Sequence, residues 1–126
     1  MLSQQSKYAL RALQHLKTLE SGTFVRVEEI AKATDLPAAY LSKVLKLLVH
    51  EELLESRRGK NGGVALMERK KPLTFMDICK AVEDPIVASE CVLRKQSCNL
   101  KAPCSFHLKW SETKKRLLLF LEREAV

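Results

Sequence analysis

Glycine and proline are scarce in this sequence, with four residues of each among 126. No stretch rich in Gly or Ser interrupts the chain, and such stretches are the usual flexible linkers between domains. At this length we therefore expect one domain, or one compact domain with an appendage. The hydrophobic share of 46% is ordinary for a globular protein and allows a core to form.

Long apolar segments are also absent. The longest apolar run is LLLFL at residues 117–121, which is far too short to cross a bilayer. The first ten residues, MLSQQSKYAL, lack the apolar region and the small-residue cleavage site of a signal peptide. We therefore expect a cytoplasmic protein with no membrane partner. Thiols stay reduced in that compartment, so clustered cysteines indicate metal ligands or redox groups rather than disulfides.

Acidic side chains are in the minority. The chain has 15 Asp and Glu against 22 Lys and Arg, and its formal net charge is +7. The excess lies mostly in residues 1–72, which carry 13 basic and 8 acidic side chains. A small basic protein is suited to a polyanionic partner, and nucleic acid is the first candidate.

The first half of the chain contains the pattern of a helix-turn-helix. Apolar residues at three-residue spacings predict a helix over residues 3–20. Two shorter helices follow, and the DLP sequence at 35–37 ends one and begins the other. In the second, Ser42, Lys43 and Lys46 are expected to face away from the core. On these residues alone, a plain three-helix core with a solvated charged face stays an alternative. The predicted buried face of the second helix consists of Tyr40, Leu41, Val44, Leu45 and Leu48.

A β-hairpin is predicted next. Short apolar segments at 53–54 and 64–67 flank the sequence RRGKNGG, and the Asn-Gly pair at 61–62 is typical of hairpin turns. A hairpin after a helix-turn-helix makes a winged helix, a combination much more specific for DNA binding than either half. Glycines let the backbone approach a surface closely, and arginines suit the negative potential of a narrow minor groove. The candidate contacts on this wing are Arg57, Arg58 and Lys60.

Two further helices are predicted after the wing. The first is capped by Thr74, with Asp77 placed for a capping box, and Cys79 lies on its apolar face as a small buried residue. From Ser105 onward, a long helix is apolar over much of its circumference. Such a helix on so small a protein favours a symmetric homodimer, with packing on its own domain as the alternative. Its stripe consists of Phe106, Trp110, Thr113, Leu117, Phe120 and Leu121, widened by Leu118 and Leu119.

Three of the four cysteines cluster with one histidine between these two helices. Cys91, Cys98, Cys104 and His107 follow the pattern C-x6-C-x5-C-x2-H. Three thiolates and an imidazole can hold structural zinc, although only the last step has the usual zinc spacing. The same ligands suit an iron–sulfur cluster, which accepts His in place of Cys. Zinc, a cluster and a solvent-facing histidine without a ligand role all stay open. An enzyme is not expected, because no orienting group or oxyanion feature accompanies the Cys–His pair.

Several motifs, taken together in their order along the chain, resemble those of a known family over essentially the whole sequence. They are KYALRAL, EEIAKATDLPAAYLSKVLKLL, ESRRGKNGGVAL, LTFMDICKAVE and C-x6-C-x5-C-x2-H-x2-W. With them the sequence resembles the IscR/NsrR-type family of bacterial winged-helix iron–sulfur transcription regulators. The C-x2-H-x2-W ending is similar to the IscR branch, although the first cysteine gap is six residues where that branch has five. Lys7 stands where the NsrR branch has an acidic ligand, which counts against that branch.

This resemblance implies a dimeric transcription factor whose C-terminal helices cross between subunits and whose cluster switches its binding to an operator. Cys91, Cys98, Cys104 and His107 would hold a 2Fe–2S cluster, favoured over 4Fe–4S. The stretch that corresponds to the family's base-reading helix offers Ala39, Ser42 and Lys43, so a different operator is implied.

The sequence therefore predicts a mainly α winged helix-turn-helix with a β-hairpin wing and a long C-terminal dimerisation helix. Residues 1–72 would form the DNA-binding domain, and residues 73–126 the cluster-binding loop and dimerisation helices. The predicted function is a DNA-binding transcriptional regulator, not an enzyme, that senses iron, redox state or nitric oxide through its cluster. The alternatives are a zinc- or thiol-based winged-helix regulator without a cluster, or a small iron–sulfur carrier. The predicted DNA contacts are Ala39, Ser42, Lys43, Lys46, Arg57, Arg58 and Lys60.

Overall fold

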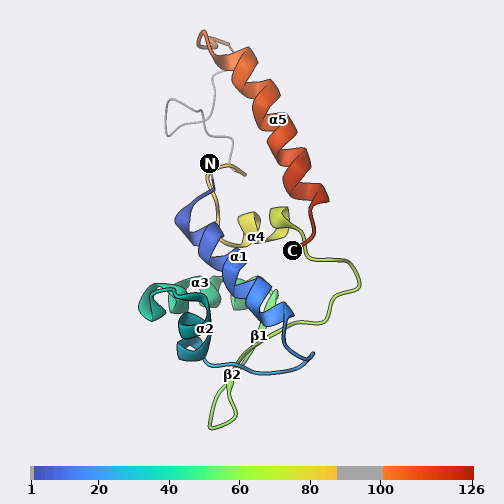
Figure 1. Cartoon of the computed structure of the whole chain (residues 1–126). Helices are drawn as coiled ribbons and strands as arrows, with labels where there is room; N and C mark the ends of the chain where they lie inside the picture. The colour runs from blue at the N-terminus through green and yellow to red at the C-terminus, as the bar shows by residue number, and fades with distance from the viewer. Residues whose placement is uncertain (1, 88–100) are drawn as a thin grey trace.

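A computed structural model describes residues 2–87 and 101–126. Three helices and a hairpin form the lower body in Figure 1, and a long helix rises from it. The mainly α winged-helix architecture expected from the sequence is confirmed. The elements are α1 (Gln4–Lys17), α2 (Val27–Thr34), α3 (Ala38–His50), β1 (Leu54–Arg57), β2 (Gly63–Leu66), α4 (Phe75–Ala81) and α5 (His107–Arg123).

Helices α1, α2 and α3 surround one hydrophobic core. The hydroxyl of Ser3 caps α1 by accepting a hydrogen bond from the Ser6 amide at 3.2 Å. Helix α2 ends at Asp35, whose left-handed φ of 55° turns the chain toward α3. The predicted buried face of α3 is confirmed except at Tyr40, which is half-buried. The fully buried side chains of these helices include Leu13, Ile30, Leu41, Leu45 and Leu48.

Strands β1 and β2 form the predicted hairpin. They pair antiparallel, from Leu54 opposite Leu66 to Arg57 opposite Gly63. Two glycines of the wing have positive φ: Gly59 in the connecting loop, at 99°, and Gly63 at the first position of β2, at 130°. Five residues separate the strands, so the loop is longer than the two-residue turn that an Asn-Gly pair typically forms.

Helix α4 joins the wing domain to the C-terminal helix. Its capping box is confirmed: the Thr74 amide donates to Asp77 Oδ2 at 2.9 Å, and the Asp77 amide donates to Thr74 Oγ1 at 3.2 Å. Ile78 and Val82 pack in the core of α1–α3, while Cys79 is buried, as predicted, on the side toward α5. The core thus continues from the winged helix into α4, and the division of the chain at residues 72 and 73 stays a prediction.

Helix α5 is anchored at its C-terminal end. It begins at His107, two residues later than predicted, with Phe106 at the capping position. The Phe75 amide donates to the Glu124 carbonyl at 3.1 Å, and the Val126 amide donates to the Leu73 carbonyl at 2.8 Å. Within residues 2–87 and 101–126, no helix is both long and apolar enough to span a membrane.

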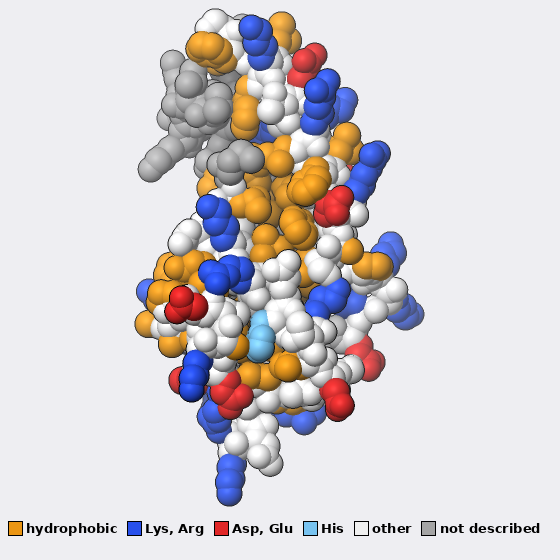
Figure 2. All heavy atoms as spheres, in the orientation of Figure 1, with side chains coloured by type: hydrophobic (Ala, Val, Ile, Leu, Met, Phe, Trp, Pro, Cys, Tyr) orange, Lys and Arg blue, Asp and Glu red, His pale blue; other side chains and the backbone are white. Residues whose placement is uncertain are grey.

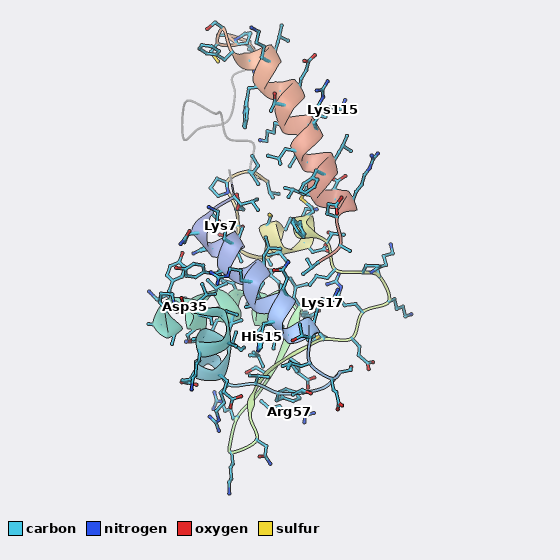
Figure 3. The ribbon with its side chains drawn as sticks, viewed as in Figure 1. Lys7, His15, Lys17, Asp35, Arg57 and Lys115 are labelled. Atoms are coloured by element: carbon cyan, nitrogen blue, oxygen red, sulfur yellow. The ribbon has the colours of Figure 1, made fainter. Side chains whose placement is uncertain are left out.

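Most residues of α5 are exposed or half-buried. Leu121 is its buried residue, and it packs against Met76, Cys79 and Ile86. On the face seen in Figure 2, apolar side chains gather where α5 meets the body of the molecule. Lys115 on this helix and Arg57 near the wing lie toward opposite ends of the molecule (Figure 3). The large apolar side chains left exposed on α5 and at its start are Phe106, Leu108, Leu119 and Phe120.

Candidate nucleic-acid interface and metal-ligand loop

The helix-turn-helix presents one face of α3 to solvent. Leu41, Val44 and Leu45 occupy the buried positions, so the residues between them point outward. Ala39, Lys43 and Lys46 are exposed, and Ser42 is half-buried. The four α3 residues predicted from the sequence are therefore accessible to a partner.

The wing carries its three predicted basic residues in exposed positions, but they are not equivalent. The guanidinium of Arg57 lies over the Phe24 ring, 4.2 Å from its centroid. Arg57 also pairs with Glu55 at 3.8 Å on the same strand. Arg58 and Lys60 belong to the loop beyond β1, on either side of Gly59.

Arg26 is a basic residue of this face that sequence reasoning missed. It lies at the N-cap of α2, and its Nη2 donates to the carbonyls of Gly59 and Lys60 at 2.7 and 3.1 Å. The neighbouring Val25 exchanges two backbone hydrogen bonds with Val64, at 2.9 and 2.8 Å. The extended FVRV sequence at 24–27 was the available signal, because an extended segment beside a hairpin can add a short strand to it.

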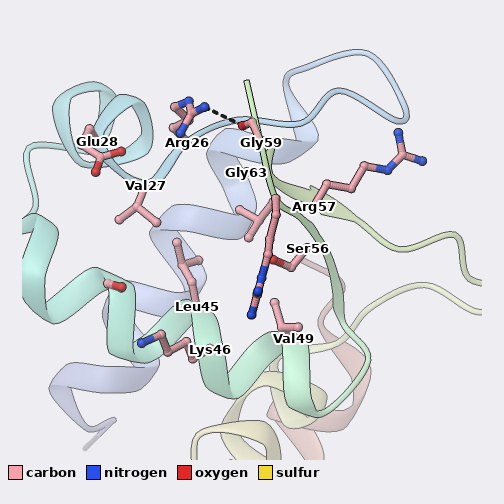
Figure 4. A pocket seen from close by; sticks show the side chains of 13 residues that line it. Arg26, Val27, Glu28, Leu45, Lys46, Val49, Ser56, Arg57, Gly59 and Gly63 are labelled. Atoms are coloured by element: carbon pink, nitrogen blue, oxygen red, sulfur yellow. Dashed lines mark hydrogen bonds between the residues drawn. The ribbon is translucent and has the colours of Figure 1, made fainter. Parts of the chain in front are cut away.

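A groove of about 440 Å³ lies between α3, the start of α2 and the wing. Figure 4 shows Lys46 on its α3 side and Arg26 beside Gly59, with the hydrogen bond that joins the latter two. The structure thus brings four predicted contacts, Ser42, Lys46, Arg57 and Arg58, to one groove. Ala39, Lys43 and Lys60 are exposed outside its lining. A concave surface with Lys46 on one wall and arginines on the other suits a DNA strand, whose phosphates are negatively charged.

Two of the four predicted metal ligands are described, and they are close together. The His107 amide donates to the Cys104 carbonyl at 3.0 Å, which holds both residues in one turn at the start of α5. Cys104 is exposed and carries no disulfide. Cys91 and Cys98 lie outside the described residues. Within the described part of the chain, no three His, Cys, Asp or Glu residues gather as a metal site would require.

The imidazole of His107 has an unsatisfied ring nitrogen. Its Nδ1 is buried and, among the described residues, has no hydrogen-bond partner; the same holds for the indole Nε1 of Trp110. A buried polar atom without a partner costs roughly 1–3 kcal/mol, so an additional ligand is expected there. A thiolate and an imidazole one turn apart are suitable donors for zinc or an iron–sulfur cluster. The described half of the ligand set therefore fits such a group.

A buried carboxylate lies between the start of α1 and the segment that enters the cysteine loop. Asp84 is 1% exposed, and its Oδ2 accepts hydrogen bonds from the Ser3 amide at 2.8 Å and the Ser6 hydroxyl at 2.5 Å. Its Oδ1 accepts from the Ile86 amide at 2.9 Å. Burial opposes the charged form, but these hydrogen bonds outweigh it and hold the pKa of Asp84 below its ordinary value. Burial raises the pKa of the neighbouring Cys79 thiol, so that thiol stays protonated.

Comparison with known proteins identifies the family of this winged helix. Residues 2–126 match the Rrf2 family, described as "Iron-dependent Transcriptional regulator". The chain belongs to the Rrf2 family. A protein of Aquifex aeolicus (strain VF5), named as an HTH-type transcriptional regulator, is 33% identical over 124 residues, which cover 97% of this chain and 85% of the relative. The transcriptional regulator NsrR of Geobacillus kaustophilus is 26% identical over 122 residues, covering 96% and 83%.

Solved structures agree with the Rrf2 assignment at the level of the fold. CymR, the global cysteine regulator of B. subtilis, aligns with a TM-score of 0.78 at 22% identity, covering 99% of this chain and 92% of that one. T. potens IscR aligns with a TM-score of 0.73 at 21% identity, covering 99% and 82%. This Rrf2 protein is accordingly a DNA-binding transcriptional regulator and not an enzyme, as the sequence predicted.

Proposed function

We propose that this Rrf2 protein regulates transcription through an iron–sulfur cluster held by Cys91, Cys98, Cys104 and His107. The observation that carries the proposal is the backbone turn that joins Cys104 to His107 just ahead of α5, with the buried Nδ1 of His107 lacking a partner among the described residues. The family's description as iron-dependent supports an iron group over zinc. When bound, an iron–sulfur cluster supplies a response to redox state or to small oxidants, because its charge changes with its oxidation state.

The finer assignment is to the IscR branch, with a 2Fe–2S cluster. Two features of the sequence support this assignment. One is the C-x2-H-x2-W sequence from Cys104 to Trp110, and the other is Lys7, which stands where the NsrR branch has an acidic ligand. A mixed set of thiolates and imidazole raises the reduction potential relative to four thiolates, which suits a sensor.

The chain's own contacts offer a route from the cysteine loop to the DNA-binding face. At the entrance of the loop, Asp84 is hydrogen-bonded to Ser3 and Ser6 at the start of α1. Beyond its exit, Glu124 and Val126, which follow α5, are hydrogen-bonded to Phe75 at the start of α4 and to Leu73 just before it. Helix α4 in turn packs on α1 and α3. A change in the arrangement of the cluster ligands would therefore reach the winged helix through two sets of contacts, one at the start of α1 and one at α4.

The DNA contacts of the proposed function divide between the two grooves of an operator. Ala39, Ser42, Lys43 and Lys46 of α3 would face the major groove, where lysine binds guanine or phosphate. The wing residues Arg57, Arg58 and Lys60 would reach the minor groove and the phosphates.

Two copies are needed to bind a twofold operator, and the proposed homodimer forms through α5. Its support is the apolar surface that α5 leaves exposed, including Leu108 with 78% and Leu119 with 39% of its surface accessible. In this proposal, residues 1–72 bind DNA and residues 73–126 hold the cluster and the dimer contact.

The decisive experiment is anaerobic purification followed by iron, zinc and sulfide counts and by absorption and electron paramagnetic resonance spectra. We expect about two iron and about two sulfide per chain, as a 2Fe–2S cluster requires. Cys104→Ala and His107→Ala should each reduce the iron content. Cys79→Ala is the matched control and should retain it, because Cys79 is a buried thiol that packs beside α5 and is not one of the proposed ligands.

The same preparations separate the alternatives. One zinc per chain with no sulfide would indicate a zinc-stabilised regulator, and a metal-free protein that cannot be reconstituted would indicate a thiol-based one. Either result would contradict the cluster. The holo protein and its chelated form should differ in affinity for a selected DNA duplex by about tenfold, a typical allosteric coupling. A cluster-loaded protein with no salt-dependent duplex binding would instead be a carrier.

A further inference from the structure

Three consecutive residues ahead of α2 each contact a different part of the wing. The ring of Phe24 lies against the guanidinium of Arg57, at the end of β1. Val25 pairs with Val64 on β2 through two backbone hydrogen bonds. Arg26 donates to the carbonyls of Gly59 and Lys60 in the loop between the strands. We call residues 24–26 the wing brace.

The tip of the wing needs such support. A two-stranded hairpin is at best marginally stable by itself, and β1 and β2 have only four residues each. Phe24 and Val25 contact the two strands of the wing. Of the three brace residues, only Arg26 contacts the loop at the tip. Its Nη2 lies 2.7 Å from the Gly59 oxygen and 3.1 Å from the Lys60 oxygen, so one guanidinium bonds two successive carbonyls. These carbonyls come just after Arg58, and the second belongs to Lys60 itself.

Arg26 and its hydrogen-bond acceptor Gly59 both line the groove between α3, the start of α2 and the wing. Arg26, Arg58 and Gly59 line it together with Lys46 of α3. The N-cap position of Arg26 ties it to the first turn of α2, which is part of the helix-turn-helix. Figure 4 shows the hydrogen bond from Arg26 to Gly59; with the second bond, to Lys60, it links the helix-turn-helix to the tip of the wing.

We propose that Arg26 is a positioning residue for DNA binding, which holds the wing tip through the Gly59 and Lys60 carbonyls so that Arg58 meets the minor groove while α3 occupies the major groove. The proposal rests on the proposed wing contact with DNA. Arg26 acts here through the loop and not as a phosphate contact of its own. A pre-positioned loop loses less conformational freedom on binding, which raises affinity without adding a contact to DNA.

The test uses the full-length holo protein and the duplex that it selects from a randomised DNA library. Four proteins are compared by fluorescence anisotropy: the parent, Arg26→Gln, Arg58→Ala and the double variant. Lys80→Gln, an exposed charge on α4, is the control for loss of one positive charge. Circular dichroism verifies that each variant is folded, and hydrogen exchange of residues 57–63 is measured without DNA.

We expect the effects of the Arg26 and Arg58 substitutions on DNA affinity to be coupled. Arg26→Gln and Arg58→Ala should each weaken binding about 10-fold, in the range of a specific arginine contact. In the Arg26→Gln background, Arg58→Ala should cost only about 2-fold, because residues that act through one another are not additive. Exchange of residues 57–63 should accelerate in Arg26→Gln while exchange in α3 stays unchanged. Lys80→Gln should change affinity by less than about 2-fold.

Other outcomes would overturn the proposal. Additive losses, with a salt dependence reduced by about one charge in Arg26→Gln, would make Arg26 an ordinary phosphate contact. Unchanged exchange of residues 57–63 would show that the carbonyl contacts do not hold the tip. If the parent binds its duplex and Arg58→Ala alone has no effect, the wing contact fails and the positioning role fails with it. If the parent selects no duplex at all, the proposed function itself is wrong.

Discussion

The guanidinium of Arg57 lies 4.2 Å from the centroid of the Phe24 ring, and this contact separates Arg57 from the other basic residues of the wing. Arg57 also faces Glu55 at 3.8 Å, so its charge is already partly matched within the protein. We therefore predict that Arg57→Ala weakens DNA binding by less than about 3-fold, whereas Arg58→Ala weakens it by about 10-fold. Anisotropy titrations on one selected duplex at fixed salt measure both values. An equal or larger loss for Arg57→Ala would show that its contacts with Phe24 and Glu55 do not weaken its contribution to DNA binding.

Position 63 needs a glycine because the wing packs closely against the backbone of Val25 there. The φ of Gly63 is 130°, and a Cβ at this position would overlap the carbonyl oxygen of Val25. Gly63→Ala should destabilise the protein by about 3 kcal/mol, the upper range for a strained backbone position. Gly22→Ala is the matched control, because Gly22 also has a positive φ of 81° but open space around it. It should cost only about 1 kcal/mol.

Urea denaturation followed by circular dichroism gives both free energies of unfolding. Equal losses for the two alanine variants would mean that the Val25–Val64 pairing gives way without cost, and the close approach would then not be the reason for Gly63.

Asp84 should make stability depend on pH. Its three hydrogen bonds lower its pKa in the folded protein, so its stabilising contribution is present above the ordinary carboxyl value near pH 4. That contribution is lost as the pH falls through the lower pKa of the folded state. At pH 7, Asp84→Asn should cost about 2 kcal/mol, because hydrogen bonds to a buried charge are among the stronger ones.

The stability difference between the parent and Asp84→Asn should therefore shrink at acidic pH, which denaturant melts across a pH series can follow. Asp35→Asn is the control: the residue is exposed, and asparagine tolerates its left-handed backbone. It should change stability by less than about 0.5 kcal/mol. A difference for Asp84→Asn that persists unchanged at low pH would show that shape, not charge, is what the site requires.

The apolar surface of α5 should control the oligomeric state. Leu119 is 39% exposed in the single chain, and Leu119→Glu would place a charge in the proposed dimer contact. We expect the parent to have twice the mass of the chain in light scattering after gel filtration, and the variant to have the mass of one chain, because an unpaired buried charge is costly. Lys70→Glu, in the exposed segment between the wing and α4, should stay dimeric. A variant Leu119→Glu that is still dimeric would move the contact elsewhere.

Local patterns were sufficient to predict most of the elements. The capping box of Thr74 and Asp77, the turn at Asp35 and the outward face of α3 all depend on residues within four positions of one another. The same is true of the pairing of Cys104 with His107. The sequence predicted the hairpin but not which of its glycines have positive φ, because that depends on the length of the loop and on what the strands approach.

By itself, the sequence determined the winged-helix class, the basic face of α3 and the wing, and the two ligand candidates that share a turn, because short-range periodicity and spacing encode all three. Only the tertiary structure decided that Arg57 lies over Phe24, that Arg26 is hydrogen-bonded to Gly59 in the wing loop, and that Asp84 is hydrogen-bonded to the start of α1. Arg26 and Gly59 are 33 positions apart, and Ser3 and Asp84 are 81 apart. Contacts over such separations exist only once the core has brought the elements together, and no local pattern records them.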